Sequence, residues 1–95
     1  MMQAIKDFYI ATGAIVTGNV TLAAGVNIWY TCVLRGDIAP ITLGPRVNLQ
    51  DGTIVHVDHN VPLDIEEGVV VGHGAILHGR RIGPGCLIGM GARLL

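Results

Sequence analysis

The stretch IATGAIVTGNVTLAAGVNIWYTCVL, residues 10–34, places a large aliphatic residue at every sixth position. The residue four places after each of these is small in most cases. A period of six with a large aliphatic residue and a small partner is typical of a hexapeptide β-helix. In that architecture six residues form one short strand and one corner, and three such units form one triangular coil. The large residues of this stretch are Ile10, Val16, Leu22, Ile28 and Leu34.

The period continues to the end of the chain, with insertions of three and four residues and one slip of a single residue. These positions predict an all-β fold, a parallel β-helix of about four to five coils that occupies residues 1–95 as a single domain. A helical fold competes poorly, because Gly and Pro interrupt every window long enough to hold a helix. The later large residues are Leu43, Leu49, Val55, Ile65, Val71, Leu77, Ile82, Ile88 and Leu94.

The charge and composition of the chain exclude several classes of partner. Six Lys and Arg against seven Asp and Glu give a net charge of −1, so no basic surface for nucleic acid or an anionic membrane is expected. No apolar run approaches the ~18 residues that cross a bilayer. The first ten residues lack the basic head and apolar core of a secretion signal. We therefore expect a cytoplasmic protein.

Cys32 and Cys86 are too few for a disulfide scaffold and fit a reducing compartment. Both occupy the small inward position of the repeat, so we interpret them as core thiols and not as metal ligands. A stack this short leaves its ends and flat faces exposed, which favours self-association. A trimer is the natural closure for a triangular prism, and we expect the segment 28–30 (IWY) to face outward and supply interface area.

Two of the four histidines share one place in the repeat. His56 follows the large residue Val55, His78 follows Leu77, and one full coil separates them. We expect them to lie one above the other on the same outer face, about 4.8 Å apart at the backbone. Two imidazoles that lean together can bind one zinc ion, with Zn–N distances of about 2.0–2.1 Å. The alternative is that both are ordinary surface residues.

His73 lies on the preceding face of the triangle, so in one subunit it should point away from this pair. A neighbouring subunit in a threefold assembly presents that other face at the interface. A three-histidine site shared between two chains follows, with a fourth position open for water, which is typical of a catalytic zinc centre. His59 lies near a loop, and we expect it to be exposed to solvent, or to support a ligand from outside the coordination sphere, and not to be a ligand itself.

Four strings resemble the gamma-class carbonic anhydrases. They are VLRGD at 33–37, NLQDGTIVHVDH at 48–59, VGHGAILHG at 71–79 and IGMGA at 88–92. Many acyltransferases share hexapeptide repeats, but the histidine spacing together with RGD and QDG is specific. The resemblance implies a left-handed β-helix, a homotrimer, and reversible hydration of carbon dioxide to bicarbonate by metal-bound hydroxide at the trimer interface.

The resemblance also implies roles for individual residues. His56, His73 and His78 are similar to the three zinc ligands, although iron or cobalt could occupy the same set. Arg35 and Asp51 resemble the charged pair that tightens the interface beside the metal. The resemblance makes Gln50 the group that hydrogen-bonds near the bound solvent, with Asn48 and Asp37 in the same pocket region.

The chain also departs from this family. It carries Ile38 and His59 where the archetype has glutamates, one of them a proton shuttle, and His59 could replace that shuttle. The family continues for more coils and a C-terminal helix, and we expect no such helix within residues 1–95. Two alternatives therefore stay open. One is a hexapeptide acyltransferase that uses acyl-CoA, and the other is a non-catalytic metal-binding assembly module.

Overall fold

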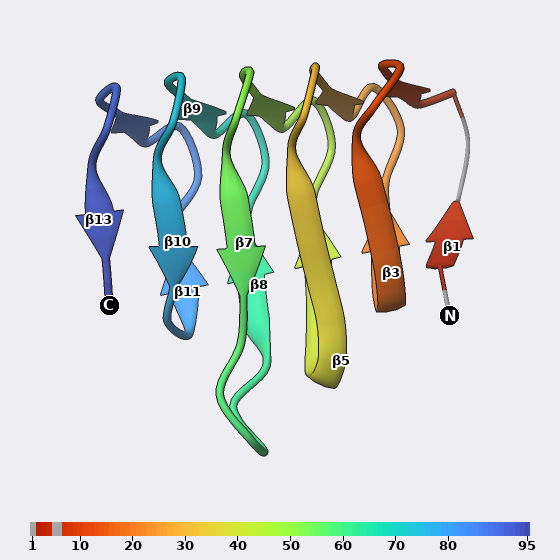
Figure 1. Ribbon diagram of the computed structural model, residues 1–95, viewed down its shortest axis with the longest axis vertical. Helices are drawn as coiled ribbons and strands as arrows, with labels where there is room; N and C mark the ends of the chain where they lie inside the picture. The colour runs from red at the N-terminus through yellow and green to blue at the C-terminus, as the bar shows by residue number, and fades with distance from the viewer. Residues whose placement is uncertain (1, 5–6) are drawn as a thin grey trace.

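The computed structural model describes the backbone of residues 2–4 and the whole of residues 7–95. These residues form a β-solenoid of about four turns, consistent with a left-handed β-helix, and contain no helix (Figure 1). All the strand pairings are parallel, which confirms the predicted fold class. The strands are β1 (Met2–Ala4), β2 (Tyr9–Ile10), β3 (Ile15–Leu22), β4 (Asn27–Ile28), β5 (Val33–Leu43), β6 (Asn48–Leu49), β7 (Ile54–His56), β8 (Leu63–Ile65), β9 (Val70–Val71), β10 (Ile76–His78), β11 (Arg81–Ile82), β12 (Leu87–Ile88) and β13 (Arg93–Leu94).

The solenoid has three faces. The histidine face consists of β7, β10, β13 and the first halves of β3 and β5. The second face consists of β1, β8, β11 and the second halves of β3 and β5. The asparagine face consists of β2, β4, β6, β9 and β12. Strands β3 and β5 each run across the corner between the first two faces, and equivalent strands of successive coils lie side by side (Figure 1).

The large residues of the repeat fill the interior as predicted. From Leu22 to Leu77 every one of them is buried, whereas those of the outermost coils are partly exposed. A residue in an outermost coil has a neighbouring coil on one side only. The period did not mark Ile41 and Leu63, which are also buried. Each lies two places before a large residue on the same strand, so strand alternation turns it inward as well.

Two expectations about burial are wrong. Cys32 is fully buried, as predicted, but Cys86 is exposed. Cys86 occupies the inward position in the last coil of the described residues, where no further coil packs over it. Ile28 is also fully buried, so the segment 28–30 does not face outward as a whole. Only Trp29 and Tyr30 reach the surface, because Ile28 is one of the inward large residues of the repeat.

Each coil passes from the asparagine face to the histidine face through a two-residue turn. Backbone hydrogen bonds stack these turns, with the amide of Gly52 donating to the Tyr30 carbonyl at 2.9 Å and that of Gly74 to the Asp51 carbonyl at 2.9 Å. The second turn residue has a positive φ, which glycine adopts without strain. In successive coils this residue is Gly13, Thr31, Gly52, Gly74 and Gly91, so it is glycine in every coil but the second.

The corner between the histidine face and the second face varies in length. Strand β5 crosses it without a break, whereas a loop at 57–62 joins β7 to β8 and protrudes from the solenoid (Figure 1). After β10 only residues 79–80 separate the two faces. On both sides of this corner the large residues of adjacent coils are register partners, Leu34 with Val55 before it and Leu43 with Ile65 after it.

Candidate metal centre

His56 and His78 lie one above the other on the histidine face. They are register partners in β7 and β10, and their ring centroids lie 5.8 Å apart with the planes inclined by 33°. Val55 and Leu77 precede them and point inward, so strand alternation turns both imidazoles outward. Their side chains are 32% and 25% exposed. The predicted stacking of these two histidines is confirmed.

Each of these imidazoles contacts one carboxylate. Nε2 of His56 lies 3.1 Å from Oδ1 of Asp37, and Nε2 of His78 lies 3.2 Å from Oδ1 of Asp58. A neutral imidazole that donates its Nε2–H to a carboxylate keeps Nδ1 as an acceptor for a proton or a metal ion. Each ring therefore keeps one nitrogen that a metal ion could occupy, while its other nitrogen contacts a carboxylate.

Arg35 lies in the same column, as the register partner of His56 in the preceding coil. Its Nη2 donates to Oδ2 of Asp37 at 2.8 Å. The Arg35 guanidinium lowers the pKa of Asp37, and the contact with His56 lowers this pKa further. Arg35 thus pairs within its own chain with Asp37 and not with Asp51, its counterpart in the predicted charged pair. We call Arg35, Asp37, His56, Asp58 and His78 the column half-site.

His73 lies apart from this pair, as predicted. It is the exposed first residue of the turn between β9 and β10, and its carbonyl accepts the Gly91 amide at 2.9 Å. The same turn one coil earlier holds Asp51, which the residue Gln50 precedes. We call Gln50, Asp51 and His73 the corner half-site. Within the described part of the chain, no three His, Cys, Asp or Glu side chains come together around a point that could hold a metal ion.

Gln50 takes part in a chain of side-chain hydrogen bonds on the asparagine face. Its Nε2 donates to Oδ1 of Asn48 at 3.1 Å, and Nδ2 of Asn48 donates to Oδ1 of Asn27. The same Asn27 oxygen accepts Nε1–H of Trp29 at 2.9 Å. Asn48 therefore supports Gln50, as the expected shared pocket region suggests, whereas Asp37 belongs to the column half-site.

The chain is similar to known proteins over nearly its whole length. It is 46% identical over 93 residues to a carbonic anhydrase of Geobacillus kaustophilus, with 98% of this chain and 51% of the relative covered. It is 43% identical over 96 residues to the mitochondrial gamma carbonic anhydrase 2 of Arabidopsis thaliana, with 95% and 34% covered. A probable carbonic anhydrase of Methanocaldococcus jannaschii is 41% identical, with 94% and 56% covered.

The chain is a relative of the gamma-class carbonic anhydrases. It spans between about a third and a little over half of the length of the relatives named above. No protein-family model matches it. Among the described residues there is no helix of the length and apolarity that a membrane span requires.

In this gamma-class relative, His59 and Ile38 are both exposed. His59 lies at the tip of the loop between β7 and β8, next to the isolated antiparallel bridge between Asp58 and Val61. The prediction that His59 is exposed is confirmed. Ile38 is 46% exposed and lies in β5 next to Asp37, so it presents an apolar side chain beside the column half-site.

Spacing did not identify the carboxylates that contact the two histidines, and only Asp37 was expected nearby, from the resemblance. In the column, Asp37 follows Arg35 by two places and Asp58 follows His56 by two places. Each contacts the histidine of the next coil. The repetition of this two-residue offset one coil later is the signal that could have identified both.

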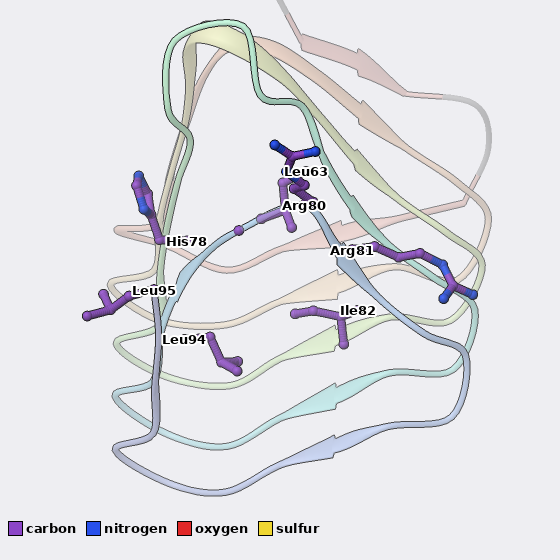
Figure 2. A pocket seen from close by; sticks show the side chains of 8 residues that line it. Leu63, His78, Arg80, Arg81, Ile82, Leu94 and Leu95 are labelled. Carbon is purple, nitrogen blue, oxygen red and sulfur yellow. The ribbon is translucent and has the colours of Figure 1, made fainter.

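A separate pocket of about 230 Å³ opens at the last coil of this gamma-class relative (Figure 2). Arg80, Arg81 and four apolar side chains line it, and of the predicted ligands only His78 does. Arg81 is paired with Glu66, which raises the pKa of the guanidinium. Two cationic side chains oppose a metal cation, so this pocket is not the predicted metal site.

Proposed function

We propose that this protein catalyses the reversible hydration of carbon dioxide to bicarbonate at a zinc site that two chains of a homotrimer share. The observation that carries the proposal is the stacked pair His56 and His78, held by carboxylates on an open face. The similarity to carbonic anhydrases supports carbon dioxide as the substrate class. Iron or cobalt suits the same ligands.

The third ligand in this proposal is His73 of a neighbouring chain. Within one chain His73 is exposed at a corner, away from the column half-site. The histidine face also exposes an apolar column beside the histidines, with Ile15 55% and Ile54 41% exposed. An exposed apolar strip of this kind suits an interface between subunits. One column half-site and one corner half-site that meet between two chains would bring three imidazoles together.

The residues of the two half-sites have separate tasks in the proposed reaction. Zinc, when bound, supplies a Lewis acid that lowers the pKa of water from about 15.7 towards 7. Asp37 and Asp58 hold the imidazoles of His56 and His78, and Arg35 holds Asp37. Arg35 and Asp51 of neighbouring chains tighten the interface.

Gln50 hydrogen-bonds to the reacting water. Hydration releases one proton for each bicarbonate formed, and His59, on its exposed loop, passes that proton to bulk solvent.

The proposal also places the protein in the cytoplasm. Both cysteines are free thiols, which suits a reducing compartment.

Three measurements on the purified protein test this function together. We expect one zinc per chain by elemental analysis, a trimer by light scattering, and carbon dioxide hydration in a stopped-flow assay. A metal-free monomer would contradict the proposal. A metal-loaded trimer without hydration activity would favour a non-catalytic assembly module, and affinity for CoA without bound metal would favour an acyltransferase.

A further inference from the structure

The hydrogen bonds around Gln50 have a direction that a single side chain determines. The indole Nε1–H of Trp29 can only donate, so the atom of Asn27 that faces it at 2.9 Å is the oxygen. The remaining amide group of Asn27, Nδ2, donates to the Gly25 carbonyl at 3.2 Å. The orientation of the Asn27 amide is therefore fixed at both of its ends.

This orientation passes to the next coil. Asn48 faces the same oxygen of Asn27, and two amide oxygens cannot hydrogen-bond to each other, so Asn48 must present Nδ2. The oxygen of Asn48 then faces Gln50, which must present Nε2, at 3.1 Å. The carbonyl oxygen Oε1 of Gln50 is left over, and no donor among residues 7–95 hydrogen-bonds to it.

The ring of Trp29 is itself held in place by aromatic neighbours. Its centroid lies 5.0 Å from that of Tyr9 and 6.0 Å from that of Tyr30. Tilted aromatic pairs at these separations are favourable. The donor that begins the chain of hydrogen bonds is thus packed between two rings, and the three amides that follow it are partly buried.

We propose that Trp29 and Asn27 are positioning residues that orient the Gln50 amide, so that Gln50 offers its carbonyl oxygen as an acceptor at the corner half-site. The proposal rests on the proposed function for the assignment of Gln50 to that site. An acceptor matches water, or the hydroxyl of bicarbonate, because both have O–H groups to donate. Carbon dioxide has none, so Gln50 orients the water that is consumed and does not bind carbon dioxide.

Side-chain amide NMR tests this orientation without reference to activity. W29F keeps an aromatic ring but loses the N–H donor, and N27L loses the acceptor. In both variants we expect the Gln50 NH2 protons to exchange with solvent about fivefold faster. N27D keeps an oxygen for both Trp29 and Asn48, so its Gln50 protons should exchange as in the wild type. Asn19 is exposed and outside the network, and N19L is the matched control. Unchanged exchange in both W29F and N27L would overturn the proposal.

Kinetics then connect the orientation with the reaction. We expect N27L to lower kcat for hydration about two- to fivefold at unchanged KM for carbon dioxide, with N27D close to the wild type. Altered amide exchange with an unchanged kcat in N27L would overturn the positioning role. If the wild-type protein does not hydrate carbon dioxide, the proposed function fails, while the NMR comparison still decides the direction of the hydrogen bonds. Melting temperatures identify any variant that does not fold. If W29F does not fold, the comparison of N27L with N27D is sufficient to test the proposal.

Discussion

His56 and His78 are register partners on adjacent coils, with their ring centroids 5.8 Å apart. The backbone ladder between β7 and β10 fixes this relationship, because one step of register would turn either side chain towards the core. The two imidazoles are therefore placed by the parallel pairing of the strands and do not depend on a flexible loop.

Removal of either histidine should abolish metal binding. Changes in residues that only support a ligand lower metal affinity by about 10–100-fold. H56A and H78A each remove a ligand itself, so we expect a larger loss of zinc affinity from either variant. Elemental analysis after dialysis measures it. H59A should keep the metal, because His59 lies on the protruding loop. Full metal content in both H56A and H78A would refute the site.

Mixed assemblies should distinguish the two half-sites. H73A removes the corner half-site and H56A removes the column half-site. A complete site forms only where an H73A chain supplies the column and an H56A chain supplies the corner, so random assembly should restore about a quarter of the shared sites. H56A and H78A lack the same half and should restore none. Metal content of co-refolded mixtures measures this. Equal recovery in the two mixtures would contradict a site shared between chains.

His59 should matter when buffer is scarce. We expect H59A to lower the turnover of hydration at low buffer concentration, on the order of tenfold, because the released proton then lacks a carrier. Added imidazole should restore the rate. Unchanged turnover of H59A at low buffer concentration would exclude His59 as the shuttle.

Gly36 should not tolerate a side chain, although its φ is not positive. A Cβ at this position would lie 2.6 Å from the carbonyl oxygen of Asn19 and 3.0 Å from its carbon, both of them backbone atoms. We expect G36A to lower the free energy of unfolding by about 1–3 kcal/mol, as measured by urea denaturation. Gly79, where a Cβ meets no atom within 4 Å, is the matched control, and G79A should change little. Equal stability of the two variants would contradict this packing.

The two thiols should differ in reactivity. Burial raises the pKa of Cys32, so a smaller fraction of this thiol is thiolate at a given pH. Its sulfur also donates to the backbone carbonyl of Gln50 at 3.1 Å. Cys86 is exposed. A disulfide reagent at pH 8 should therefore modify one thiol per chain in the native protein and two in urea. A fast-reacting thiol in native C86S would contradict the burial of Cys32.

The periodicity was sufficient for the fold and for the histidine column. A six-residue period assigns each residue to a face, so counting coils between Val55 and Leu77 placed His56 under His78. Burial in the outermost coils was harder to predict. The repeat marks which residues face inward, but the exposure of Cys86 depends on whether another coil packs over it.

Position in the repeat predicts only part of the hydrogen bonding in the candidate site. Arg35 pairs with Asp37 because both lie on β5 at the point where it bends around the corner. The amides of Asn27 and Asn48 face each other because β4 and β6 are in register. A period of six gives the face of each residue, but the reach of a long side chain depends on the local path of the backbone.

The corner between the histidine face and the second face accepts chain segments of different length. Chain segments of three different lengths cross it in successive coils, and the strands on either side keep their pairing. New sequence could be grafted at the 57–62 loop to display peptides or recruit other molecules. The solenoid would carry such an insertion and keep the two imidazoles aligned by strand pairing, as long as Asp37 and Asp58 keep their contacts with His56 and His78 at this corner.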